Sequence, residues 1–199
     1  MTRTLTTKRL ILRAPCSADA ASIARYLNNF AVAGNLGRVP YPYALADAER
    51  WLTALAPEPD AEETSFAIEL PGAGYIGAVG LHHEVRTPTL GYWLAEPFWH
   101  RGFMTEAAAA VVTWYFGLNR SDVIYSGVFH FNKASLAVQK KLGFVETDTN
   151  IRRCLARGED VRHIDTALSR EQWQEAPIHR QQRWAASLPD ERAIARDSR

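Results

Sequence analysis

Hydrophobic residues recur along the chain with two different periods. Alternating or continuous hydrophobic runs bounded by turn residues predict strands over residues 5–13, 65–70, 75–83, 89–94, 122–129, 144–147 and 161–168. Hydrophobic residues at helical spacing predict helices that begin after Ser17 and that cover residues 47–55, 105–116 and 132–143. This order of strands and helices predicts a mixed α+β domain whose helices pack on a central sheet.

Capping and turn residues refine this pattern. We expect Ser17 to cap the first helix, and Asn132 to cap the last one, which ends before Gly143. Residues 34–43 combine glycines, prolines and tyrosines, which predicts a loop with rigid corners that helps to shape a pocket. Residues 56–64 are acidic and proline-rich, and we expect a solvated connector there.

Length bounds the domain organisation. A chain of 199 residues is expected to form one domain, here residues 1–173, with a C-terminal extension over residues 174–199. The extension is charged and weakly amphipathic, so a peripheral helix and a frayed tail are both open. For the oligomeric state, a monomer and a homodimer both remain alternatives.

Charge and cysteine content exclude several classes of protein. The formal net charge is +1 with acids and bases interleaved, so we expect neither a nucleic-acid partner nor an anionic membrane surface. Cys16 and Cys154 have no metal-ligand spacing, which argues against a zinc site and a disulfide framework. The N-terminus has no apolar signal core, and no stretch approaches the ~18 apolar residues of a membrane span. We therefore expect a cytoplasmic protein without a metal.

The stretch over residues 97–116 carries the strongest indication of chemistry. A loop containing Gly102 follows an apolar strand and leads directly into an alanine-rich helix. The first backbone N–H groups of a helix have no partner within it, and glycine lets an anion approach them closely. The pattern indicates a cradle for a diphosphate, although a tight turn without a ligand remains the alternative. Neither a P-loop nor a dinucleotide-binding motif is present.

Two segments in order resemble the GNAT N-acetyltransferases. The run T-L-G-Y-W-L-A-E-P-F-W-H-R-G-F-M-T-E-A over residues 89–107 is similar to the acetyl-CoA motif of that family. The run N-K-A-S-L-A-V-Q-K-K-L-G-F over residues 132–144 is similar to its second signature. The opening T-K-R-L-I-L-R and the later P-Y-P-Y-A-L-A-D-A-E-R-W-L resemble the RimJ/RimL-like branch, which acetylates protein N-termini and other primary amines.

The resemblance implies a three-layer α/β arrangement. Its central sheet would be mixed and mostly antiparallel, with helices on both faces and with two central parallel strands that splay apart. Acetyl-CoA would be the co-substrate, with its pantetheine arm inserted between those strands. The cofactor-binding residues implied are Trp93, Leu94 and Ala95 for pantetheine, the amides of Arg101, Gly102, Phe103, Met104 and Thr105 for the diphosphate, and Asn132 for the pantetheine arm. The cradle departs from the family's pattern at Trp99, His100 and Met104.

Candidate catalytic residues come from two places. Alternation along residues 75–84 puts His82 and Glu84 on one face of a strand, where either could take a proton from the acceptor ammonium. Both could equally be ordinary strand-end residues. The resemblance implies a tyrosine as the acid in the second signature, but Gln139 stands there and cannot donate a proton productively. The resemblance to the RimJ/RimL-like branch implies Ser135 as the candidate acid, and its alternative role is to bond the first turn of its helix.

These features predict direct transfer of an acetyl group from acetyl-CoA to a primary amine. The resemblance favours a protein or peptide N-terminus as the acceptor, such as that of a ribosomal protein. A small-molecule amine is the nearest alternative. A second alternative is a non-catalytic acyl-CoA-binding module, because Gln139 and Met104 depart from the family's pattern.

Overall fold

The computed structural model describes residues 4–55, 64–84, 87–118 and 121–179, apart from the side chains of residues 83 and 84. Its strands are β1 (Leu5–Thr6), β2 (Ile11–Arg13), β3 (Thr64–Leu70), β4 (Gly74–Glu84), β5 (Thr87–Leu94), β6 (Val123–Phe129), β7 (Val145–Cys154) and β8 (Glu159–Ser169). Its α-helices are α1 (Ala20–Leu27), α2 (Phe30–Ala33), α3 (Leu45–Ala54), α4 (Phe103–Gly117), α5 (Lys133–Leu142) and α6 (Arg170–Gln174). Short 3₁₀ turns, η1 (Ser17–Asp19) and η2 (Glu96–Phe98), precede α1 and α4.

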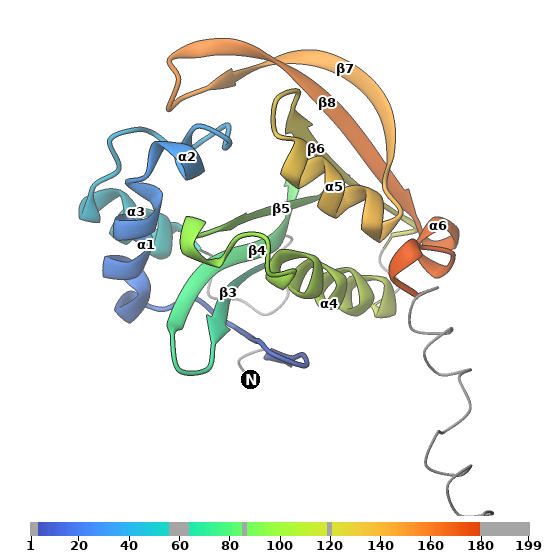
Figure 1. The fold of residues 1–199 in the computed structure, drawn as a ribbon, viewed down its shortest axis with the longest axis horizontal. Coiled ribbons are helices and arrows are strands. Elements are labelled where there is room, and N and C mark those ends of the chain that lie inside the picture. Colours follow the sequence, from blue (N-terminus) through green and yellow to red (C-terminus); the bar gives the residue numbers. More distant parts are fainter. Residues whose placement is uncertain (1–3, 56–63, 85–86, 119–120, 180–199) are drawn as a thin grey trace, which may run out of the picture.

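All of these strands belong to one sheet, in the order β1-β2-β3-β4-β5-β6-β8-β7. Neighbouring strands are antiparallel except β5 and β6, which are parallel. The long β7–β8 hairpin curves over one end of the molecule, as Figure 1 shows. The predicted mixed sheet with one central parallel pair is confirmed.

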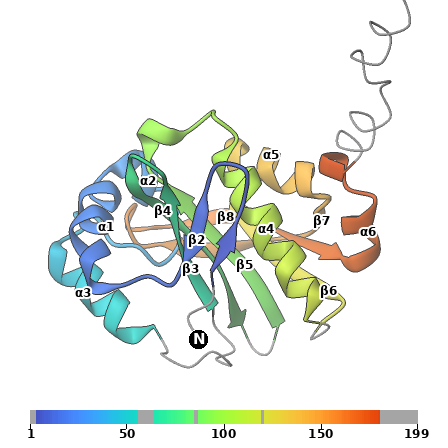
Figure 2. The ribbon, with the colours of Figure 1, turned by 90° about the horizontal axis from the view of Figure 1, so that it is seen from below.

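Helices cover both faces of this sheet. On one face, α4, α5 and α6 bury side chains such as Val111, Leu142 and Trp173 against Phe66, Ile76 and other strand residues. On the other face, α1, α2 and α3 pack a smaller cluster around Ile23, Leu27 and Tyr75. Figures 1 and 2 show these two groups of helices on opposite sides of β3, β4 and β5. The predicted three-layer arrangement is therefore confirmed.

The N-terminal segments differ from the prediction in two respects. Residues 5–13 form a hairpin of two short strands, because Thr7 turns the chain: its N–H donates to Leu10 O (2.9 Å), and its Oγ1 accepts from Leu10 N (2.9 Å). Ser17 does not cap the first helix. It lies in the preceding 3₁₀ turn, and the N-cap of α1 is Asp19, whose carboxylate accepts from Cys16 N at 2.9 Å.

The helix that carries the second signature matches its prediction closely. Asn132 caps α5 by accepting from Ser135 N at 3.0 Å. The helix ends at Gly143, which has a φ of 92° that favours glycine. By contrast β7 is longer than predicted, because most of its side chains are exposed and show little hydrophobic alternation. The predicted connector over residues 56–63 and the C-terminal extension beyond residue 179 lie outside the described residues.

Candidate active site

The two parallel strands in the middle of the sheet touch at a single point. Thr89 of β5 and Tyr125 of β6 are the one residue pair in their ladder within the described chain. Ser126 adds a side-chain link there, since its Oγ donates to Leu90 O at 2.8 Å. Beyond this point the strands diverge and leave the edge of β5 open toward β6. This is the splay that the resemblance implied.

Strand register decides which backbone groups face the opening. Ala95 N donates to Ile76 O of β4 at 2.9 Å, and hydrogen bonding alternates along an antiparallel pair. Trp93 and Ala95 therefore direct their backbone groups toward β4, whereas Tyr92 and Leu94 direct theirs toward the gap. Of the three residues predicted to bind pantetheine, Leu94 alone has its backbone on the open side, and Tyr92, which was not among them, shares that side.

The start of α4 lies beside this gap. Gly102 is the N-cap with a φ of 76°, and no side chain caps the helix. Among the described residues, no protein acceptor binds the amides of Phe103, Met104 and Thr105. These donors, with the partial positive charge of the helix N-terminus, form a ready site for an anion.

Arginine side chains add positive charge at the same place. Arg9 and Arg101 lie over the ring of Phe103, with Cζ at 4.4 Å and 4.8 Å from its centroid. Arg9 also donates from Nε to Glu106 Oε2 at 2.7 Å and from Nη1 to Arg101 O at 2.9 Å. A Cβ added to Gly102 would lie 3.5 Å from Arg9 Nη2, so the guanidinium borders the cradle. The position of Arg9 beside the cradle was not predicted from the sequence.

The residues that depart from the family's pattern do not block the cradle. Met104 is 8% exposed, and its side chain packs into the main core under α4. Trp99 turns back and donates from Nε1 to Leu94 O at 2.7 Å. His100 is exposed and has a φ of 59°, which places the tight turn just before Gly102. The backbone amides therefore remain accessible despite these side chains.

A hydroxyl pair lies where β5 faces α5. Ser135 Oγ donates to the hydroxyl of Tyr92 at 2.9 Å, and that hydroxyl donates to Ser135 O at 3.2 Å. Burial raises the pKa of Tyr92 to about 12, although hydrogen bonds with Ser135 and Gln139 act in the opposite direction. Tyr92 is thus a neutral donor near neutral pH. Asn132 and Ser135 line the same cavity as Tyr92.

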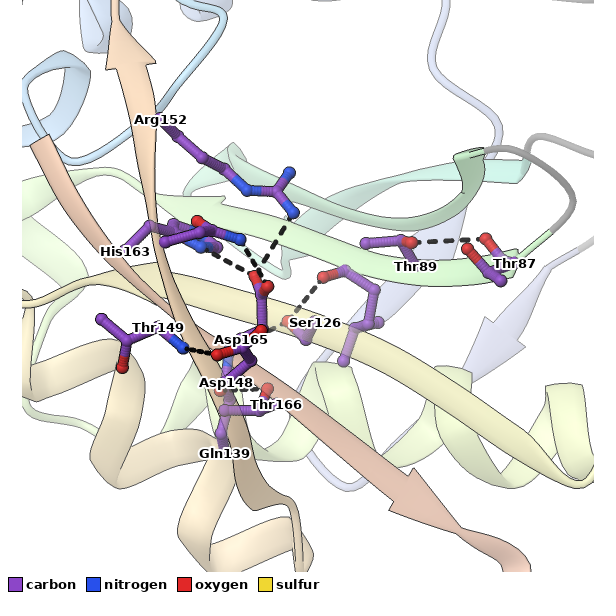
Figure 3. Close-up of polar contacts among 12 residues, drawn as sticks. Thr87, Thr89, Ser126, Gln139, Asp148, Thr149, Arg152, His163, Asp165 and Thr166 are labelled. Atoms are coloured by element: carbon purple, nitrogen blue, oxygen red, sulfur yellow. Dashed lines mark hydrogen bonds and ion pairs between the residues drawn. The ribbon is translucent and has the colours of Figure 1, made fainter. Parts of the chain in front are cut away.

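Gln139 occupies the place of the expected tyrosine and is 1% exposed. Its Nε2 donates to Ser126 Oγ at 2.9 Å, and its Oε1 accepts from Thr166 Oγ1 at 2.9 Å. Figure 3 shows this chain of contacts crossing from α5 to β6 and β8. Because Ser126 also bonds Leu90 O, Gln139 braces the point where the parallel strands part. Its role is structural.

The opposite face of the sheet carries the predicted base. His82 is opposite Thr89 in the register, and its ring lies over Gly91, whose added Cβ would stand 3.3 Å from His82 Cε1. His82 lines the cavity. The backbone of Glu84 is opposite Thr87 in the register, and its side chain lies outside the described part of the structure.

A second imidazole on this face was missed by sequence reasoning. His163 Nδ1 lies 2.9 Å from Asp165 Oδ1, and Arg152 Nη2 donates to the same oxygen at 3.3 Å (Figure 3). Asn150 Nδ2 donates to Asp165 Oδ2 at 2.6 Å. The signal available in the sequence was the alternation that puts His163 and Asp165 on one face of β8.

One cavity of about 1060 Å³ joins the gap between β5 and β6, the Tyr92–Ser135 pair and the two imidazoles. It is lined by residues 35–40, 78–82, 89–93 and 125–129, by side chains of α3, and by residues of the β7–β8 hairpin that include His163 and Asp165. The predicted pocket-shaping loop therefore contributes one wall. The gap between β5 and β6 lies in the floor, so groups on both faces of the sheet can approach one reacting centre.

A family model described as an acetyltransferase (GNAT) domain matches residues 9–145. The chain belongs to the GNAT acetyltransferase family. The expected family and enzyme class are thereby confirmed, and GNAT acetyltransferases use acetyl-CoA. No curated protein matches the sequence. Within the described residues of this GNAT chain, no helix is long and apolar enough to span a bilayer.

Solved GNAT structures share the fold at low sequence identity. Mycobacterium smegmatis RimJ in complex with CoA-disulfide is similar with a TM-score of 0.75 and 22% identity, over 90% of this chain and 91% of that chain. The ribosomal-protein-S5-alanine acetyltransferase from Vibrio fischeri is similar with a TM-score of 0.72 and 20% identity, over 86% and 98% of the two chains. RimL, a ribosomal L7/L12 alpha-N-protein acetyltransferase in its apo form, is similar with a TM-score of 0.71 and 16% identity, over 85% of this chain and 95% of that chain. At sequence identities this low, the structural similarity establishes a shared fold only.

Proposed function

We propose that the protein transfers an acetyl group from acetyl-CoA to a primary amine, with a protein or peptide N-terminus as the acceptor. The observation that carries this proposal is the set of unpaired amides at the start of α4, beside the gap between β5 and β6. Bound there, acetyl-CoA supplies the thioester as an activated acyl group.

The residues of the cradle fit a diphosphate. Gly102 carries no side chain between the helix start and the Arg9 guanidinium, and the amides of Phe103, Met104 and Thr105 can donate to phosphate oxygens. Arg9 and Arg101 would add charge-assisted bonds. Tyr92 and the N–H of Leu94, whose carbonyl already accepts from Trp99, would offer the open edge of β5 to the pantetheine arm, and Asn132 lies on the other wall.

Two groups of side chains would serve the chemistry. On the α5 side, Tyr92 and Ser135 would protonate the sulfur as the C–S bond breaks, because their hydroxyls form a bonded pair that stays neutral near pH 7. On the opposite face, His82 and Glu84 remain candidate groups for the ammonium proton of the acceptor. Holding both reactants in one cavity would itself lower the barrier by several kcal/mol.

The shape of the cavity supports a peptide acceptor over a single small amine. Its volume of about 1060 Å³ extends from the gap to α3 and to residues 35–40. Part of that space would hold the pantetheine arm beside Tyr92 and Asn132, and the part along α3 and residues 35–40 could hold the residues that follow a peptide N-terminus. Structural neighbours that include RimJ and RimL agree with this choice.

A panel of acceptors tests the proposal. The protein is incubated with acetyl-CoA and with peptides that have free N-termini, with the same peptides blocked at the N-terminus, and with small primary amines. We expect release of coenzyme A thiol and an acetyl mass gain with free-terminus peptides, and none with the blocked ones. Turnover restricted to small amines would select the small-molecule alternative. Coenzyme A binding without turnover on any amine would select a non-catalytic binding module.

A further inference from the structure

We infer that His163, oriented by Asp165, is the base that accepts the proton from the acceptor ammonium. This inference rests on the proposed function and names the group that takes the proton from the acceptor amine. The observations that carry it are the carboxylate contact of the imidazole, its place beside the splayed strands and its position in the cavity wall.

The contact with Asp165 fixes which ring nitrogen can act. With Asp165 ionised, His163 Nδ1 carries the hydrogen and donates it across 2.9 Å, which leaves Nε2 as the basic nitrogen. Asp165 is itself held by Asn150 at 2.6 Å and by Arg152 at 3.3 Å. An imidazole whose carboxylate partner is held by two further residues keeps one orientation and one tautomer.

The backbone of β6 is shaped to accept this ring. A Cβ added to Gly127 would lie 2.2 Å from His163 Cε1 and 2.8 Å from Nε2, so only glycine admits the imidazole there. Gly127 comes two residues after Tyr125, the last residue of β6 that pairs with β5. His163 Nε2 therefore lies over β6 just beyond the point where the strands part.

His82 provides a partial counterpart on β5. Its ring lies over Gly91, which comes two residues after Thr89, the partner of Tyr125. The two imidazoles thus stand on the same face of the sheet, one on each of the diverging strands, and both line the cavity. His163 Nδ1 lies 2.9 Å from a carboxylate oxygen of Asp165, an arrangement typical of bases that are oriented for proton transfer.

The proton balance of the step is simple. The ammonium loses one proton to His163 Nε2, and its nitrogen lone pair then forms the new C–N bond at the thioester carbonyl. The C–S bond breaks, and the sulfur leaves as coenzyme A thiol after it gains a proton. The nitrogen gives up a second proton as the amide forms, and this proton balances the one taken up by the sulfur. The imidazolium of His163 returns its proton to solvent.

His163→Asn is the most direct test. The asparagine amide can keep a donor where Nδ1 stands, so the contact with Asp165 survives while Nε2 is removed. We expect kcat to fall by about a hundredfold or more with a peptide α-amine, with an unchanged KM for acetyl-CoA. The loss should shrink for an acceptor whose amine is already neutral at the assay pH. His163→Gln serves as a second variant should the first fail to fold, as judged by thermal unfolding and by coenzyme A binding.

Asp165→Asn tests the orienting contact. We expect a smaller loss of kcat, about tenfold, and NMR of isotope-labelled histidine should show the His163 hydrogen leaving Nδ1. In the wild type the same spectrum should show Nε2 without a hydrogen at neutral pH. A hydrogen on Nε2 would contradict the assignment without any activity measurement.

His130→Gln is the matched control, since His130 is exposed and is not among the described residues that line the cavity. Its activity should equal that of the wild type. Wild-type activity in both His163 variants, or a loss of activity confined to His82→Gln, would overturn the assignment of His163 as the base but leave the proposed function standing. No turnover by the wild type with any amine would overturn the proposed function, and the assignment with it.

Discussion

At the scale of single residues, Gln139 shows how a departure from a family pattern can be structural. Its amide satisfies two buried hydroxyl groups, those of Ser126 and Thr166, at the point where the parallel strands part. In the proposed reaction, the proton donor that a tyrosine would supply from α5 would come instead from Tyr92 of β5, which is hydrogen-bonded to Ser135. Gln139 itself holds the sheet together at this point.

Removing this amide should cost stability. Gln139→Leu leaves the Ser126 and Thr166 hydroxyls without their partner in the core, so we expect the free energy of unfolding to fall by about 1–3 kcal/mol. Urea denaturation measures the difference. Lys141→Ala, at an exposed position of the same helix, is the control and should change stability little. A Gln139→Leu protein as stable as the wild type would show that the brace is unimportant.

Gly102 allows a matched test of the cradle. Gly102 and Gly72 have φ values of 76° and 84°, and alanine at either position would be strained by about 1–2 kcal/mol in the left-handed region. Only Gly102 borders the start of α4. We expect Gly102→Ala to weaken coenzyme A binding by about tenfold because the amides no longer converge, whereas Gly72→Ala keeps wild-type affinity. Calorimetry measures the affinity of each variant for coenzyme A. Equal affinities in the two variants would count against a main-chain cradle.

At the scale of elements, an acidic side chain ties the N-terminal hairpin to α4. Glu106 in the first turn of α4 accepts from Thr7 Oγ1 at 2.7 Å, from Arg9 N at 2.8 Å and from Arg9 Nε at 2.7 Å. Burial acts to raise the pKa of this carboxyl, but the hydrogen bonds from Thr7 and Arg9 outweigh it, and the net pKa lies below its usual value. The contact therefore fixes Arg9 beside the cradle.

This lowered pKa predicts a pH-dependent contribution to stability. A carboxyl with a lower pKa in the folded state stabilises the fold above its unfolded pKa of about 4.3, and this contribution is lost as the pH falls through the folded pKa. Glu106→Gln should therefore be less stable than the wild type at pH 7, and the difference should shrink below about pH 4. Chemical denaturation at several pH values measures it. Glu49→Gln, on the exposed side of α3, should show no such trend.

The sequence predicted the elements whose determinants are local. The cap at Asn132, the glycine that ends α5 and the glycine before α4 all depend on residues within one or two turns of each other. Contacts between distant positions could not be predicted in this way. Ser135 meets Tyr92 across 43 positions, and the ring of His163 lies on Gly127 only because β6 and β8 pair in one register. The sequence showed an alternation in β8 but no sign of what stands opposite it.

At the scale of the whole molecule, the sheet consists of two parts joined by little backbone hydrogen bonding. β1 to β5 form one antiparallel part, and β6 to β8 form the other. The Thr89–Tyr125 pair and the Ser126–Leu90 bond link them through the strands, and α4 and α5 pack across one face. A ligand that fills the gap should therefore join the two parts of the sheet, as an additional strand would.

Hydrogen exchange can measure this effect residue by residue. The amides of Tyr92 and Leu94 face the gap, so we expect them to exchange faster without coenzyme A and more slowly once it binds. The amides of Trp93 and Ala95 face β4 and should be protected in both states, which makes them internal controls. Equal protection of all four amides without ligand would contradict the open edge.

The proposed diphosphate cradle and the cavity come from separate stretches of the chain. The cradle is built by the start of α4 and by Arg9, which lies between β1 and β2, whereas residues 35–40 and the β7–β8 hairpin line the cavity. Exchanging the hairpin or the loop for that of another family member leaves the cradle residues untouched. Acceptor preference could therefore diversify in evolution, or be redesigned by grafting, while the machinery for the acyl donor is inherited unchanged.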